Sequence, residues 1–186
     1  INAQSRALED QLRRSGIPYQ IVGGVRFYER KEIKDALAYL RLVVNPADDV
    51  AFRRAIAAPS RGIGKATLAR LEEVALREQV PLLEAVARLD SEVTGKARKG
   101  LEDFARLLET LRRKKDGTGL PALIDEIMAL SGYRETLRQE RTAEAESRLE
   151  NLDELIAAAE EFQQDDGGGL EVKRPRLRQA LLIAAV

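Results

Sequence analysis

The apolar residues between positions 29 and 162 recur at the three- and four-residue spacing of α-helices, and this pattern most constrains the fold. Such spacing places them on one face of each helix, where they can pack against a neighbouring helix. Aromatic residues make up only 4% of the chain, so the core is predicted to consist mostly of Leu, Ile, Val and Ala. Three stripes show the pattern: Ile33, Leu37, Leu40 and Val44; Leu101, Phe104, Leu108 and Leu111; Leu149, Leu152, Ile156 and Ala159.

Prolines and glycines indicate where the helices begin and end. Asn45 followed by Pro46 predicts a helix with the asparagine as N-cap and the proline at its first position. Pro81 and Pro121 are predicted to occupy similar first positions, and residues 132–137, "GYRETL", to lie between helices. Residues 163–169, "QQDDGGG", are typical of a linker or exposed loop.

A single stretch, residues 17–24 ("IPYQIVGG"), predicts a β-strand, and a helix over residues 3–15 precedes it. A lone strand leaves its backbone groups unpaired, so most of its sheet is expected to lie outside this chain. We therefore predict a mainly α fold with a small α/β strip at its N-terminal end. Because the chain begins with Ile1 and not with methionine, we expect a processed or excised fragment.

The composition excludes several classes of function. The chain has no cysteine, which removes disulfides and thiolate metal sites and fits a reducing cytoplasm. It has no histidine either, so a Ser-His or histidine-zinc mechanism is not available. No apolar run approaches the roughly 20 residues that cross a bilayer. Lys plus Arg and Asp plus Glu number 31 each, so any nucleic-acid binding must depend on local basic patches.

Residues 59–68, "PSRGIGKATL", resemble a phosphate-binding loop and raise the question of which phosphates they bind. A nucleotide P-loop needs glycine where Pro59 stands and Ser or Thr where Ala66 stands, and it follows a strand, whereas a helix is predicted here. A turn between two helices fits better, with one helix ending near residues 56–58 and the next running from 65 to 79.

Such a helix-hairpin-helix can bind the DNA backbone, because free N–H groups at the start of the second helix point at a phosphate. Ile63 would lie inward as an apolar pin, and the two glycines permit close approach of the backbone to a ligand. Spacing alone does not separate this function from an ordinary glycine turn. The candidate DNA-binding residues are Arg61, Gly62, Ile63, Gly64, Lys65 and Thr67.

The other charged groups are predicted to be solvated helix faces. Those around residues 26–34 have Glu29 and Glu32 as neighbours at helical spacing, and residues 112–115 end a helix, where cations are favourable. Basic residues also occur between 173 and 178, with no purpose indicated by the pattern. Glu140, Glu144, Glu146 and Glu150 lack metal-like spacing, so we predict an exposed acidic face and neither a catalytic nor a metal site.

Residues 2–49, from "NAQSR" through "GGVRFYERKEIKDALAYLRLVVNPADD", resemble the UvrD/PcrA/Rep group of superfamily 1 DNA helicases. "RGIGKATL" and "GYRETLRQERTAEAESRLENLDEL" are similar to later segments of that group, so the resemblance extends to about residue 162. The residues that carry the first match are Asn2, Gln4, Ser5, Arg6, Gly23, Gly24, Phe27, Glu29, Arg30 and Lys34.

The resemblance implies that residues 1–44 begin the second RecA-like lobe (2A), and that 45–162 are the helical accessory subdomain (2B) inserted in it. Residues 163–186 would be a linker and return segment. It implies an ATP-dependent helicase moving 3′ to 5′, with an accessory subdomain that contacts duplex or fork DNA. Asn2, Gln4 and Arg6, with Arg26 and Arg30, would belong to the motor surface near nucleotide and single-stranded DNA.

The chain lacks the Walker motifs of the family, so we expect ATP and Mg²⁺ to bind elsewhere in the parent helicase and this chain alone to be inactive as an enzyme. Its expected partners are DNA and the remaining helicase lobes, with no membrane. Two alternatives remain open: a freestanding helix-hairpin-helix DNA-binding module, and a helical protein-interaction or autoregulatory domain.

Overall fold

The computed structural model describes residues 27–91 and 93–165. The short 3₁₀ helices are η1 (Phe27–Glu29), η2 (Val86–Arg88) and η3 (Lys115–Gly117). The α-helices are α2 (Lys31–Val44), α3 (Asp49–Ala57), α4 (Lys65–Glu78), α5 (Leu82–Ala85), α6 (Gly95–Lys114), α7 (Leu120–Leu130), α8 (Tyr133–Glu140) and α9 (Ala143–Asp165). Within these ranges there is no β-strand, which confirms the mainly α prediction. The strand predicted over residues 17–24 and the helix over 3–15 lie outside the described residues.

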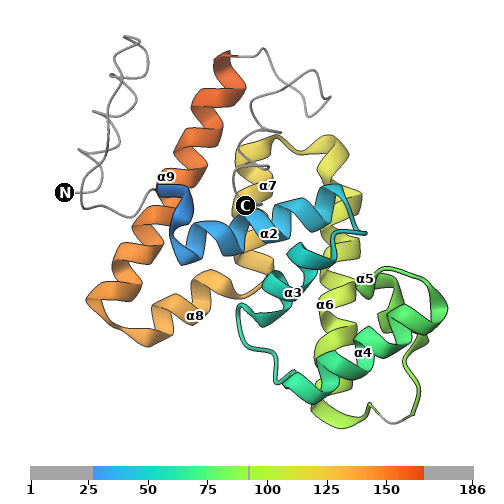
Figure 1. Ribbon diagram of the computed structural model, residues 1–186. Coiled ribbons are helices and arrows are strands. Elements are labelled where there is room, and N and C mark those ends of the chain that lie inside the picture. The colour runs from blue at the N-terminus through green and yellow to red at the C-terminus, as the bar shows by residue number, and fades with distance from the viewer. Residues whose placement is uncertain (1–26, 92, 166–186) are drawn as a thin grey trace.

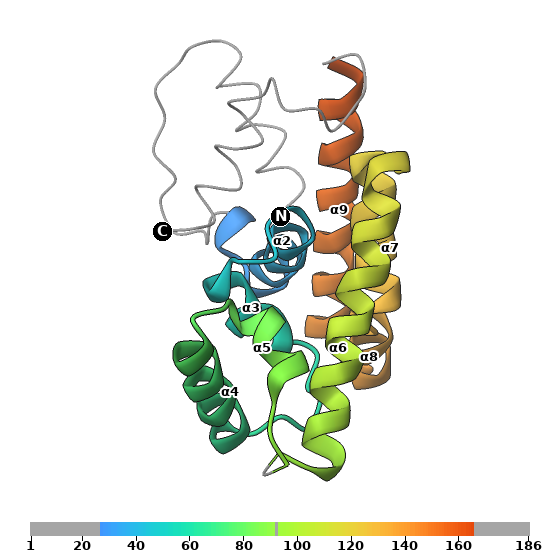
Figure 2. The ribbon, with the colours of Figure 1, turned by 90° about the vertical axis from the view of Figure 1, so that its right-hand side faces the viewer.

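Helix α2 lies at the centre of the bundle, where it contacts α3, α6, α7 and α9 (Figure 1). Its apolar face is buried as the spacing predicted, except at its last residue, where Val44 is 50% exposed. Helix α9 runs along α7 and α8, whereas α4 packs mainly on α5, on the opposite side of the molecule from α9 (Figure 2). The fold therefore leaves the α3–α4 connection at one end, away from α9.

Three aromatic rings form the centre of the core beneath that connection. Phe104 of α6 lies edge-on to Phe52 of α3, with ring centroids 5.4 Å apart, and to Tyr39 of α2, at 5.9 Å. All three side chains are fully buried. Edge-to-face packing of this kind adds about 0.5–1.5 kcal/mol per pair to the gain from burial. The rings thus pack α2, α3 and α6 against one another.

Two carboxylates of α2 are buried and hydrogen-bonded. Asp35 accepts a hydrogen bond from the Tyr133 hydroxyl at 2.8 Å and pairs with Arg54 at 2.8 Å. Glu32 accepts a hydrogen bond from the Asn151 side chain of α9. Burial, reinforced by the negative charge of Asp35, raises the pKa of Tyr133 far above its usual range. Its hydroxyl therefore remains a hydrogen-bond donor at every physiological pH, and these contacts fix α2 against α8 and α9.

The start of α3 differs from the prediction. Asn45 is the C-cap of α2, and the N-cap of α3 is Asp48, whose carboxylate accepts from the Ala51 N–H at 2.9 Å. Arg41 donates to the same carboxylate at 2.7 Å. The carboxylate of an aspartate accepts from a free N–H, and its negative charge is stabilised by the positive end of the helix dipole. The helix therefore begins after Asp48 and not at the asparagine–proline pair.

Three smaller predictions are also corrected. Both prolines were predicted at the first position of a helix. Pro81 is instead the N-cap of α5, so that helix begins one residue later, and Pro121 is the second residue of α7. Residues 133–137, predicted to lie between helices, belong to α8. This helix begins after Gly132, which has the left-handed backbone conformation (φ 77°).

Glu140, Glu144, Glu146 and Glu150 are all exposed, as predicted, and the described residues contain no acidic cluster that could hold a metal. None of the helices in the described part of the chain is long and apolar enough to span a membrane.

Candidate nucleic-acid interface

The connection between α3 and α4, residues 58–64, forms a tight turn, which we call the hairpin loop. Helix α3 ends at Ala57 and α4 begins at Lys65, close to the bounds that the sequence predicted. Gly62 has φ +72°, a conformation that residues with a side chain rarely adopt, so glycine is required there. Gly64 is the N-cap of α4 and supplies no side chain to the free N–H groups of the first turn.

Helix α6 packs closely against the hairpin loop through a glycine. A Cβ atom on Gly100 would lie 2.6 Å from the Arg61 carbonyl oxygen and 3.4 Å from the Ile63 side chain. Ile63 is half-buried and packs on the core, as expected for the apolar pin. The stem of Lys96, one helical turn before Gly100, lies 3.1–3.4 Å from the position of a Cβ on Gly62. The loop is therefore bounded by the first turns of both α4 and α6.

Three exposed lysines lie near the N-termini of the two helices that bound this loop: Lys65 in α4, and Lys96 and Lys99 in α6. None of them forms an ion pair with any described residue, whereas Arg70, Arg77, Arg98, Arg106 and Arg113 on the same two helices all do. Neither α4 nor α6 has an acidic residue in its first turn or a side-chain N-cap hydrogen bond. Since acidic residues are the favoured partners of a helix N-terminus, both first turns are electrostatically suited to an external anion.

Sequence reasoning missed Lys96 and Lys99. The signal was present in "GKARKG", residues 95–100, where two glycines enclose three cations. Its meaning depends on the contact between Gly100 and Arg61, which joins segments about 40 positions apart in the chain.

Arg61 does not lie where the sequence predicted. We expected it to flank the turn and to contact DNA, but its guanidinium donates into the protein, to the carbonyls of Ala55, Ile56 and Pro59 at 2.7–3.3 Å. It also lies over the Phe104 ring, 5.0 Å from the centroid. Both terminal nitrogens of this guanidinium therefore have acceptors within the protein, which does not fit the predicted direct contact with DNA.

The remaining predicted DNA-binding residues lie in the hairpin loop and in the first turn of α4, as the sequence predicted. Gly62, Gly64 and Lys65 are exposed, and Thr67 is half-buried in the first turn of α4. The backbone N–H groups of Gly64, Lys65 and Thr67 lie at the N-terminal end of that helix.

The predicted motor-lobe residues divide into two groups. Asn2, Gln4, Ser5, Arg6, Gly23, Gly24 and Arg26 lie outside the described residues. Phe27 is buried, Glu29 is exposed and Lys34 is half-buried. Arg30 was predicted to be solvated near Glu29 and Glu32, but it contacts α9 instead: it donates to the Asn151 side chain and lies 3.8 Å from Glu154. Tertiary packing brings α9 to Arg30, and helical spacing could not have predicted this.

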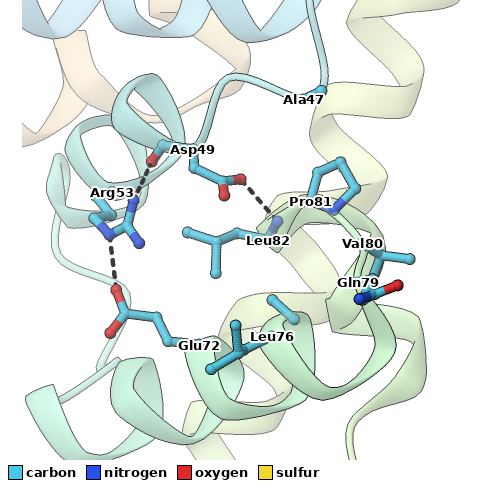
Figure 3. Close-up of a pocket in the computed structure, with 10 residues that line it drawn as sticks. Ala47, Asp49, Arg53, Glu72, Leu76, Gln79, Val80, Pro81 and Leu82 are labelled. Atoms are coloured by element: carbon cyan, nitrogen blue, oxygen red, sulfur yellow. Dashed lines mark hydrogen bonds and ion pairs between the residues drawn. The ribbon is translucent and has the colours of Figure 1, made fainter.

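A shallow pocket lies between α3, α4 and α5, separate from the hairpin loop (Figure 3). Its charged groups have partners within the protein: Arg53 donates to Glu72 at 2.7 Å, and the Asp49 carboxylate accepts from the backbone N–H of Leu82 at 2.8 Å. Leu76, on its wall, is 82% exposed. Since these charged groups already have partners within the protein and the wall is partly apolar, this pocket does not resemble a catalytic or anion-binding site.

Residues 1–173 match the UvrD-like helicase C-terminal domain family, and the chain therefore belongs to this family. The ATP-dependent DNA helicase PcrA of Bacillus subtilis (strain 168) is 42% identical over 164 residues, which cover 88% of this chain and 22% of that protein. PcrA proteins of Staphylococcus epidermidis (strain ATCC 12228) and Staphylococcus aureus (strain Mu50) are 37% and 36% identical over 167 residues, again 88% of this chain. The chain spans less than a quarter of the length of these relatives.

Proposed function

We propose that this chain is the accessory, duplex-contacting part of an ATP-dependent 3′–5′ DNA helicase that acts in repair, replication or recombination. Its membership of the UvrD-like helicase C-terminal family supports the helicase assignment. ATP and Mg²⁺ would bind to lobes of the parent outside this chain, because the sequence has no Walker motif. Its partners would be those lobes and the DNA.

The packing of α2 modifies the proposed division into subdomains. A boundary at residue 44 would separate α2 from α3, α6, α7 and α9, which it contacts. We therefore propose that the helical accessory subdomain begins before α2, near η1, and continues to the end of α9. The segment N-terminal to η1 remains the proposed strip of the second RecA-like lobe.

The observation that carries the DNA-contact proposal is that lysines near the N-termini of α4 and α6, the two helices that bound the hairpin loop, pair with no described residue. Lys65, Lys96 and Lys99 are exposed, and they flank two helix first turns without acidic residues. Together with the N–H groups of Gly64 to Thr67, they would form a composite helix-hairpin-helix surface for the phosphates of a duplex or fork junction. Backbone contacts of this kind position a protein on DNA without reading sequence.

Binding of a forked duplex by the 186-residue chain at several salt concentrations tests this proposal. We expect each of Lys65→Ala, Lys96→Ala and Lys99→Ala to weaken binding several-fold at low salt. Each should also make the dependence of log affinity on log salt shallower, by about 0.9 for every phosphate that the variant no longer neutralises.

The matched control is Arg112→Ala, at the other end of α6. Arg112 is exposed and has no ion pair among the described residues, and it lies 16 positions, about 24 Å, from Lys96. It removes the same charge far from the loop. If Arg112→Ala and the three lysine variants weaken binding equally, the affinity reflects general charge and the proposed surface is wrong.

The family match over residues 1–173 favours a helicase part over a freestanding DNA-binding module. The second alternative, a protein-interaction domain, has one observation in its favour: Val50 and Leu76 are 67% and 82% exposed on neighbouring helices. Leu76→Ser would leave DNA binding unchanged under our proposal. A protein-interaction role would instead be supported if this substitution abolished self-association measured by sedimentation.

A further inference from the structure

The guanidinium of Arg61 connects the hairpin loop to four other parts of the bundle. Nη1 donates to carbonyl oxygens at the end of α3 and to Pro59 within the loop. Nη2 donates to the Tyr39 hydroxyl of α2 and to the Ser131 carbonyl at the α7–α8 junction, the latter at 3.3 Å. The planar group also stacks over Phe104 of α6.

Tyr39 contacts the N-terminal end of the same loop. Its hydroxyl donates to the Ala58 carbonyl at 2.7 Å while it accepts from Arg61. Burial raises the pKa of Tyr39 to about 12, and the positive charge of Arg61 partly opposes this rise. The hydroxyl is therefore protonated at neutral pH and can donate and accept at once. Since Tyr39 is fully buried, it cannot itself touch a ligand at the surface.

These contacts depend on the shape of the guanidinium as well as its charge. An arginine presents five donors in one plane, whereas a lysine presents three donors from a single atom and does not stack in the same way. The carbonyls that Arg61 contacts at the end of α3 carry the negative end of the helix dipole, which a cation stabilises. A lysine at position 61 would keep the charge but could not reach all of these acceptors.

We propose that Arg61, held by Tyr39, is a positioning residue that sets the conformation in which Gly62 to Lys65 face DNA. This inference rests on the proposed DNA contact of the hairpin loop. Arg61 acts through the loop and does not contact the phosphates. Its side chain and its backbone carbonyl, which packs on Gly100, together orient the loop between α4 and α6.

Two measurements on the 186-residue chain test the proposal: amide hydrogen exchange at residues 58–66, and affinity for a forked duplex. We expect Arg61→Lys to accelerate exchange in the loop about tenfold and to weaken DNA binding about five- to tenfold, although it conserves charge. Tyr39→Phe removes only a buried hydroxyl and should change both quantities in the same direction by about two- to threefold. Tyr39→Phe also tests the proposal if the substitution at Arg61 prevents folding.

The control is Arg54→Lys, which alters an arginine of α3 that pairs with Asp35 and not with the loop. It should leave loop exchange and DNA affinity unchanged. A direct phosphate contact would show the opposite pattern, with binding abolished in Arg61→Ala, restored in Arg61→Lys, and normal exchange in both. Uniformly faster exchange across α2, α6 and α9 would indicate a general stabilising role and would also overturn the proposal. If the wild-type chain fails to bind the fork, the proposed DNA contact fails, but loop exchange still tests the role of Arg61 in positioning.

Discussion

The side chain of Lys96 lies across Gly62, with its Cε 3.1 Å from the position that a Cβ atom on Gly62 would occupy. This relationship joins the first turn of α6 to the apex of the hairpin loop. Glycine is therefore required at position 62 for two reasons: its backbone is left-handed, and the Lys96 side chain lies against the position that a Cβ atom would occupy. This relationship also brings to the loop a cation that the motif of residues 59–68 does not contain, in addition to Arg61 and Lys65.

Gly62→Ala should therefore affect the chain more than Gly64→Ala. The first substitution places a side chain at φ +72° and forces Lys96 to move, and we expect a loss of about 1–2 kcal/mol in the free energy of unfolding. A Cβ on Gly64 would meet nothing within 4 Å, so its replacement should cost less than about 1 kcal/mol. Urea denaturation measures both values. Equal losses would show that neither the backbone conformation nor Lys96 constrains the apex.

Gly100→Ala should destabilise the chain, although alanine is the better helix former by about 0.5–1 kcal/mol. The new Cβ would lie 2.6 Å from the Arg61 carbonyl, so the loop backbone must shift away from α6. We expect a lower midpoint of thermal unfolding and weaker binding to forked DNA. Gly117→Ala is the comparison, since a Cβ there meets nothing within 4 Å. A midpoint for Gly100→Ala at or above that of the wild type would contradict the close packing of loop and helix.

The chain should lose stability at alkaline pH through Tyr39. Its pKa is about 12 in the folded chain and about 10 when unfolded, so between these values the unfolded state releases a proton that the folded state keeps. The contribution is complete below pH 10 and is lost as the pH rises towards 12. The slope is about 1.4 kcal/mol per pH unit. Urea titrations at about pH 9 to 11 should show a flatter dependence in Tyr39→Phe, and parallel curves would refute the assignment.

Much of the architecture was predictable from local pattern. The three stripes of apolar residues identified helices that became α2, α6 and α9, and the bounds of the hairpin loop followed from "RGIG" between two helical segments. Helix starts were less predictable. Asp48 rather than Asn45 caps α3, because a carboxylate that also pairs with Arg41 is the stronger cap.

The sequence by itself determined the helical class, the position of the glycine turn and membership of the helicase family, since each depends on residues close together in the chain or on a contiguous motif. Only the tertiary structure decided what the cations around that turn do. Arg61 turns inward because Tyr39 and Ser131, 22 and 70 positions away, offer acceptors beneath it. Lys96 is brought to the turn because Gly100 lets α6 approach the loop. The sequence shows which residues carry charge. Long-range packing decides which of those charges are paired within the protein and which face solvent.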